Sequence, residues 1–372
     1  MRNTLYTVSL VLLCLVLSSW GATGHKKISQ NVAACLPAEM SFLKPVWTSF
    51  VANHASDADS RKSQDPNESP RHYIDIDNYP EFVLSGHIPQ TYDSVVAQFG
   101  AGFVTDQGTL PWATMITFDS LKNCFQRRDW NRSAIFAADL GHYVGDGHMP
   151  LHITKNYNGQ LTNQKDIHSR YESTMVGKYE AQIVYPADPA HYVQDVGGYV
   201  FNYLYYDYKY VDSVLLADTY ATTLAGGSTG STAYYQALWA KSGNFTILMM
   251  RNASASLADL IYTAWVQAGK PMMYPNAVDD RKTMNQPSLL EIYPNPAKDV
   301  AWFPVVMPDP ASAFSLEIYD LGGNLKDTII RKTASAGMQK ISWKIGNLVP
   351  GTYVCVLKSG SYQAVRNFIV SR

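Results

Sequence analysis

The sequence is poor in cysteine and in charge. Only 4 of its 372 residues are cysteine, and charged residues make up 16% of the chain. The formal net charge is −1 at pH 7. A balance this close to neutral argues against a broad basic surface for nucleic acid, although it leaves room for a local metal cluster that binds phosphate.

Long apolar runs are also scarce. The one clear run extends from Val8 to Leu17, with Arg2 before it and two serines after it, which is typical of a secretory signal. We therefore predict a signal peptide over residues 1–19, cleaved before Trp20. Because no other run is long and apolar enough to span a bilayer, we predict no transmembrane segment in the mature chain.

The cysteines that remain after this cut are Cys35, Cys124 and Cys355. Their spacing does not resemble a zinc ribbon. In an exported protein Cys35 and Cys124 could form a disulfide, because both fall in the same predicted domain. The other interpretation is two buried free thiols, and the sequence does not choose between them.

We predict two domains, because the spacing of apolar residues changes along the chain. Up to Gly269 apolar residues recur at helical spacing, with examples at Tyr234–Lys241 and Ser256–Gln267, so this half is predicted to be mainly α-helical. A polar stretch at residues 276–288 is predicted to be a linker. Short alternating runs separated by turns predict a small all-β sandwich over residues 289–372.

The most informative segment of the helical half surrounds His142. His142 and Asp146 are four residues apart in a segment predicted to be helical from Ser133, so both side chains point to one face of one turn. Pro150 ends that helix and lets His152 return toward the same site. Such a pair could bind zinc, although by itself it is also typical of an ordinary hydrogen-bonded pair.

Other parts of the helical half strengthen the zinc interpretation. His168 and Glu172 repeat the four-residue spacing on a second predicted helix. Acids and histidines also gather around Asp57, Asp59 and His72. A calcium loop is disfavoured there, because the glycine and the downstream glutamate of an EF-hand are missing.

The start of the predicted mature chain adds two candidates. A free amino group at Trp20, together with its own carbonyl, could chelate a metal ion, and His25 follows at the start of a helical run. From Trp20 to about Gly269 the chain resembles the superfamily of zinc-dependent phospholipases C and single-strand-specific zinc nucleases. The resemblance implies a mainly α-helical, trinuclear zinc hydrolase domain, which we assign to residues 20–275.

The resemblance also implies which residues bind three Zn²⁺. Trp20 and His25 would hold one ion, with Asp146 bridging to a second. The other ligands of the second ion would be Asp59, His72 and His142. The third ion would be held by His152, His168 and Glu172.

Asp59 and Asp146 are the implied catalytic residues, beside a water activated by the clustered zinc. The choice between Asp57 and Asp59 stays open on spacing. The segment Ala-Ser-Asp-Ala-Asp59 resembles the nuclease Ala-Ser-Trp-Ala-Asp motif, which selects Asp59, whereas the distance to His72 fits Asp57 slightly better. We prefer Asp59.

The two branches of the superfamily predict different substrates. The Trp-Gly-Ala-Thr-Gly-His start resembles the nucleases, whereas Glu172, where nucleases have Asp, and the segment after His142 resemble the phospholipases. We expect a phospholipase C-like phosphodiester hydrolase acting on phospholipid, with a single-strand-specific endonuclease and 3′-nucleotidase as the alternative. A second alternative is a non-catalytic, zinc-stabilised surface binding protein, favoured if protein ligands saturate the site.

The C-terminal half resembles the sorting domain of the type IX secretion system. The resemblance rests on Tyr293–Asp299, Ile318–Gly323, Gly351–Val354 and Phe368–Val370. It implies an encounter with the type IX machinery and a secreted or cell-surface protein, after signal cleavage and removal of the sorting domain. The alternative is a substrate-binding β-domain retained in the mature enzyme.

Overall fold

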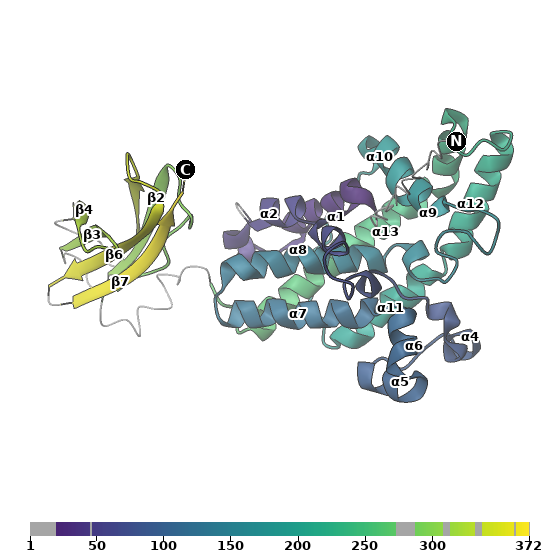
Figure 1. The fold of residues 1–372 in the computed structure, drawn as a ribbon, viewed down its shortest axis with the longest axis horizontal. Helices are drawn as coiled ribbons and strands as arrows, with labels where there is room; N and C mark the ends of the chain where they lie inside the picture. Colours follow the sequence, from purple (N-terminus) through teal and green to yellow (C-terminus); the bar gives the residue numbers. More distant parts are fainter. Residues whose placement is uncertain are drawn as a thin grey trace, which may run out of the picture. The chain divides into compact units, whose positions relative to one another are not determined.

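The computed structural model describes residues 20–44, 47–272, 287–307, 313–331, 337–360 and 362–371. Its contacts divide the chain into two compact units, the first ending at Pro271 and the second beginning at Met272. The first is helical and the second is built of strands (Figure 1). The predicted fold class, a mainly α-helical domain followed by a small all-β sandwich, is confirmed. The predicted signal peptide and residues 276–286 of the predicted linker lie outside the described residues.

The helical unit contains long helices joined by short ones. The long helices are α1 (Gly21–Cys35), α7 (Leu110–Gln126), α8 (Trp130–Gly147), α11 (Val196–Tyr208), α12 (Val211–Leu224) and α13 (Thr232–Gln267). The shorter α-helices are α2 (Trp47–Asn53), α3 (Asp57–Arg61), α4 (Pro80–Ser85), α5 (Tyr92–Phe99), α6 (Ala101–Asp106), α9 (Ile167–Ser169) and α10 (Val176–Tyr179). Short 3₁₀ helices are η1 (Ala38–Leu43), η2 (Ser69–His72), η3 (Ile76–Asn78), η4 (Pro150–His152) and η6 (Glu180–Gln182), whereas η5 (Arg170–Met175) is π-helical. Among the described helices we find none with the length and apolar character needed to cross a bilayer.

Helix α8 is central to the helical unit. It begins at Trp130, earlier than the predicted Ser133, because the side chain of Asp129 caps the helix by accepting a hydrogen bond from the amide of Arg132. Every residue from Leu140 to Gly147 is buried, and α8 packs against α1, α2, α7 and α13. Both His142 and Asp146 are therefore buried in the helical unit.

Helix α13 is longer than the sequence pattern indicated. The predicted segments Tyr234–Lys241 and Ser256–Gln267 are two parts of one helix of 36 residues. Ser231 caps its start by accepting a hydrogen bond from the amide of Tyr234. The helix packs on α1, α7, α8 and α12, so tertiary burial sustains it through the weakly amphipathic middle that the pattern left unassigned.

The second unit is a sandwich of antiparallel strands. In its described residues one sheet has the order β1-β2-β5 and the other β4-β3-β6-β7. Their bounds are β1 (Ser288–Leu289), β2 (Val300–Met307), β3 (Phe314–Asp320), β4 (Leu325–Arg331), β5 (Gly337–Lys344), β6 (Gly351–Ser359) and β7 (Tyr362–Val370). Phe303, Trp343 and Phe368 contact one another in the core between the sheets.

Candidate metal centre

The helical unit brings all the predicted ligands to one buried region. They come from separate elements: His25 from α1, Asp59 from α3, His72 from η2, and His142 with Asp146 from α8. His152 lies in η4, His168 in α9 and Glu172 in η5, and Trp20 directly precedes α1. None of these residues is more than 5% exposed. Charged and polar side chains this deeply buried need partners or metal ions.

Asp146 lies at the middle of the first part of the region. Its Oδ1 is 3.4 Å from Nε2 of His25, and its Oδ2 is 3.0 Å from Nδ1 of His72 and 3.4 Å from Nε2 of His142. Oδ1 of Asp59 reaches the same space, 3.5 Å from Nε2 of His142 and 3.6 Å from Nδ1 of His72. Nitrogen and oxygen atoms from four elements therefore face one small volume.

Glu172 organises the other part. Its Oε1 is 3.2 Å from Nε2 of His168, and its Oε2 is 3.5 Å from Nε2 of His152. The backbone nitrogen of Trp20 lies 3.0 Å from Oε2 of Glu172. Glu172 belongs to the π-helical turn η5, and single π-helical turns occur frequently at functional sites.

Hydrogen bonds to backbone carbonyls fix the orientation of three of the imidazole rings. Nδ1 of His142 lies 2.8 Å from the carbonyl oxygen of Ala55, and Nδ1 of His168 lies 3.0 Å from that of Tyr157. Nδ1 of His152 contacts the carbonyl oxygen of His72. Each Nδ1 therefore donates a hydrogen bond to a carbonyl oxygen, which leaves Nε2 to face the site, as in metal-binding histidines oriented by an outer hydrogen bond.

The composition of the region fits metal ions. Three groups of ligand atoms lie close enough together to hold an ion: His25 with Asp59 and His142; His72 with His142 and Asp146; and His152 with His168 and Glu172. Several inward-facing atoms have no hydrogen-bond partner, namely both ring nitrogens of His25, Oδ2 of Asp59, both carboxylate oxygens of Asp146 and Oε1 of Glu172. Buried polar atoms are normally paired, so these orphaned atoms are what a metal centre requires.

The charges in the region are strongly coupled. Burial would raise the pKa of Asp146, but the neighbouring His142 and His152 hold it well below its ordinary value. Burial would lower the pKa of His142, but Asp146 and Asp59 raise it to about 9. Burial, reinforced by the charge of His142, lowers the pKa of His25. The protein without metal therefore keeps a proton on His142 that metal binding has to displace.

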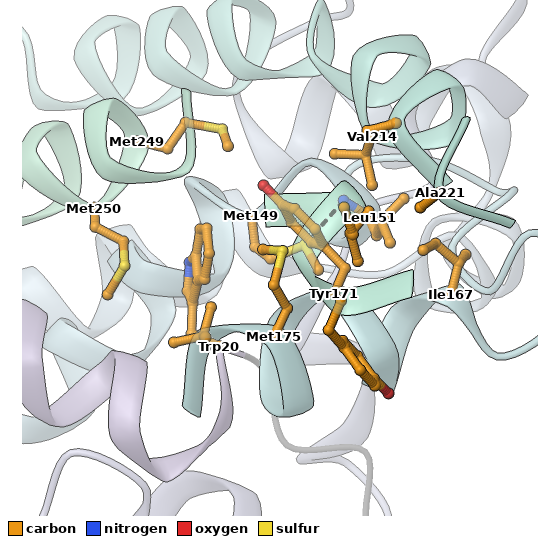
Figure 2. Close-up of a cluster of buried hydrophobic side chains, with 14 of the residues drawn as sticks. Trp20, Met149, Leu151, Ile167, Tyr171, Met175, Val214, Ala221, Met249 and Met250 are labelled. Atoms are coloured by element: carbon orange, nitrogen blue, oxygen red, sulfur yellow. Dashed lines mark hydrogen bonds between the residues drawn. The ribbon is translucent and has the colours of Figure 1, made fainter. Parts of the chain in front are cut away.

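The region also rests on apolar packing. The side chain of Trp20 is fully buried, and it lies in a cluster that includes Met149, Met175 and Met250 (Figure 2). Its indole nitrogen donates a hydrogen bond of 2.7 Å to the carbonyl oxygen of Gly145 in α8. The indole ring therefore anchors the residue whose backbone nitrogen faces Glu172.

The structure separates the two candidate aspartates. Asp59 is buried among the histidines, whereas Asp57 is exposed and pairs with His54 at 2.7 Å. The two residues are two positions apart in α3, so their side chains point to different faces of the helix. Nζ of Lys62 lies 2.7 Å from Oδ1 of Asp59, a contact that sequence reasoning missed although the three-residue spacing was visible.

Sequence reasoning also missed Glu68, which is 2% exposed. Its Oε1 lies 3.3 Å from Nε2 of His72, which leaves Nδ1 of that ring to face the site. Arg61, Arg71 and the hydroxyl of Tyr143 also bind this carboxylate. The available signal was the four-residue spacing between Glu68 and His72 within a polar loop.

Replacing Glu68 by glutamine is expected to destabilise the protein by about 2 kcal/mol at pH 7, because it removes a buried charge that accepts several hydrogen bonds. Burial would raise the pKa of Glu68, but hydrogen bonds from His72 and Tyr143 lower it from 4.5 to about 2. A carboxyl group with a lowered pKa stabilises the fold above its unfolded value and loses this contribution as the pH falls through the folded value. The difference between the two proteins should therefore shrink between pH 4.5 and about 2.

Urea unfolding of both proteins at pH 7, 4 and 3 measures this effect. Glu39→Gln is the matched control, because Glu39 is half exposed, where its contacts with Lys270 and Tyr262 are weak, and the change should alter stability by less than about 1 kcal/mol. A Glu68→Gln difference that stays constant across these pH values would contradict the assignment.

The sequence left the state of Cys35 and Cys124 open. Both cysteines are free and buried, so of the two interpretations the structure has the free thiols. His148, which lies beside the predicted ligands in sequence, contacts Asp207 and Ser256 instead.

Comparison with known proteins identifies the second unit. Residues 291–371 match the family described as the secretion system C-terminal sorting domain. Residues 291–371 are a secretion-system sorting domain. The predicted type IX sorting domain and the predicted export to the cell surface or beyond are therefore confirmed, whereas cleavage of the signal peptide and removal of the sorting domain stay predictions.

The other comparisons add two similar solved structures. The alpha-toxin of Clostridium absonum has 12% identity and a TM-score of 0.40, covering 95% of this chain and 98% of the toxin chain. The alpha-toxin of Clostridium perfringens from an avian strain has 10% identity and a TM-score of 0.43, covering 95% of this chain and 99% of the toxin chain. A search of the curated proteins found no match.

Proposed function

We propose that the helical unit is a zinc-dependent phosphodiester hydrolase of the phospholipase C type, exported by means of the sorting domain. The observation that carries the proposal is the set of three adjoining groups of buried imidazoles and carboxylates, two of which share His142. A structural zinc site uses one closed tetrahedral set of ligands, whereas adjoining sites are typical of hydrolases that act on phosphate esters.

Three Zn²⁺ would divide these residues into ligand sets that differ from the groups above, because Asp146 in place of His142 is the shared residue. His25 would act with the amino group of Trp20 and with Asp146, which also reaches the neighbouring group formed by Asp59, His72 and His142. The group formed by His152, His168 and Glu172 would hold the third ion. Zinc bound here would lower the pKa of a water molecule and offset the negative charge of a phosphodiester.

The chain's own residues would prepare the substrate and the proton transfer. Nζ of Lys62 is a cation at the partly exposed edge of the region, where it can bind a phosphoryl oxygen. Oδ2 of Asp59 has no hydrogen-bond partner and can accept a proton from the attacking water. Lys62 and His142 lower the pKa of Asp59, so its carboxylate is charged at neutral pH although burial opposes this.

The substrate can be assigned by comparing two phosphodiesters on one zinc-loaded sample that begins at Trp20. We expect dispersed phosphatidylcholine to be cleaved faster than single-stranded DNA, and a chelator to stop the reaction. The preference for lipid rests on Glu172 and on the residues after His142. Faster cleavage of DNA would favour the nuclease alternative on the same site.

The binding-protein alternative makes a different prediction in the same assay. If zinc serves only stability, a sample with full metal content would cleave neither substrate, and chelation would lower the melting temperature without changing any rate. Chelator-sensitive cleavage of either substrate contradicts that alternative.

A further inference from the structure

A second cluster of reactive side chains lies away from the metal centre, at a cavity between α11 and α13. The cavity has a volume of about 310 Å³, and its walls include Tyr203 from α11, Ser256 from α13, and His148 at the end of α8. None of the predicted zinc ligands, all of which the structure describes, lines it. This volume is within the range of small-molecule sites.

Three side chains from three helices form a chain of hydrogen bonds beside this cavity. Oδ2 of Asp207 lies 2.5 Å from Nδ1 of His148, and Nε2 of His148 lies 3.0 Å from Oγ of Ser256. Asp207 is fully buried, and the ring of His148 stacks on Tyr203 at 4.4 Å between centroids. Hydrogen bonds therefore link the acid Asp207, the base His148 and the hydroxyl group of Ser256 in that order.

This order defines the proton positions. The carboxylate of Asp207 accepts the Nδ1 proton of His148, which leaves the lone pair of Nε2 to accept the hydroxyl proton of Ser256. A hydroxyl within hydrogen-bond reach of a base that a third group orients is the arrangement of an activated nucleophile. Asp207 and Ser256 are 59 and 108 positions from His148 in sequence, so a short sequence motif does not predict this arrangement.

We propose that Ser256, His148 and Asp207 form a second catalytic site that hydrolyses small carboxylic esters by way of an acyl-serine. Asn252, one helical turn before Ser256, lines the same cavity, as does Asn202 on α11. Amide N–H groups are suitable donors for the oxyanion that forms during acyl transfer. The tyrosine rings of the wall suit a short acyl chain or an aryl group.

The reaction balances without any added cofactor. Oγ of Ser256 forms a bond to the carbonyl carbon while its proton passes to Nε2 of His148. The bond between that carbon and the alcohol oxygen then breaks, and His148 returns the proton to the departing alcohol. Water repeats the sequence on the acyl-serine, which releases the carboxylic acid and restores the hydroxyl group.

Covalent labelling tests this proposal on the full chain that begins at Trp20. A fluorophosphonate probe is expected to modify Ser256, as mapped by mass spectrometry of the unaltered protein, and chelator should not prevent the labelling. Hydrolysis of p-nitrophenyl butyrate should be equally insensitive to chelator. His148→Gln and Asp207→Asn should each lower that rate by about a hundredfold or more.

Ser254→Ala is the matched control for Ser256→Ala. Ser254 is also buried on α13, but its hydroxyl donates to the carbonyl oxygens of Ile28 and Met250 and does not reach His148. Labelling should survive in Ser254→Ala and vanish in Ser256→Ala.

Absence of a Ser256 adduct in the folded, unaltered protein would overturn the proposal and leave the cluster as a structural link between helices. Because the metal centre has no part in this assay, its failure and the failure of the zinc hydrolase proposal are distinguishable.

Discussion

Replacing Asp146 by asparagine is expected to remove two of the three zinc ions that we propose and to lower phosphodiester hydrolysis by about a thousandfold or more. The carboxylate oxygens of Asp146 lie 3.0 to 3.4 Å from ring nitrogens of His25, His72 and His142. An amide carries no negative charge and binds zinc weakly, so both ions that share this residue lose a ligand. Zinc content by mass spectrometry and the initial rate on one sample measure the two effects.

Asp139→Asn is the control for this experiment. Asp139 lies on the same helix and is largely buried, but it pairs with Arg61 and binds none of the histidines. We expect full zinc content and a near-normal rate. An Asp146→Asn protein that keeps all its zinc and its rate would refute the assignment of the centre.

A single methyl group at Gly145 is expected to have the second largest effect. A Cβ atom there would lie 2.8 Å from Nδ1 and 2.9 Å from Cε1 of His25, which is closer than such atoms approach one another. The ring of His25 is fully buried and has to shift out of its place opposite Asp146. We expect Gly145→Ala to lose the zinc ion held by His25 and to lower the rate by about a hundredfold.

This loss would occur even though alanine favours the helix over glycine by about 1 kcal/mol. Gly177→Ala in α10 is the matched control, because its Cβ meets nothing within 4 Å. That protein should keep its zinc content and its rate. Equal zinc content and equal rates in the two variants would show that His25 is not a ligand.

The sequence predicted some parts of the site for physical reasons that can be stated. His142 with Asp146, and His168 with Glu172, lie four residues apart on helical turns, so periodicity alone indicated that each pair shares a face. His25, Asp59 and His72 come from separate elements whose meeting depends on tertiary packing, so only the resemblance connected them. Whether these residues bind zinc stays a prediction until the metal is measured.

Supporting residues were harder to predict than ligands. Glu68 acts through His72, and Lys62 through Asp59, so neither belongs to a pattern of its own.

Some strands of the second unit were also hard to predict from the sequence pattern. Strand β4 is almost entirely exposed at a sheet edge, and β2 is nearly continuously buried, so neither strand has the alternation that revealed β3 and β6.

We propose that the buried histidines and carboxylates form a zinc centre that hydrolyses phosphodiesters. The most direct test is to strip the chain that begins at Trp20 of metal, add zinc in steps, and follow both bound zinc and hydrolysis of bis(p-nitrophenyl) phosphate. We expect no hydrolysis without metal and activity that rises until three ions are bound, one for each set of ligands. Hydrolysis by the metal-free protein, or an inactive protein at three bound ions, would contradict it.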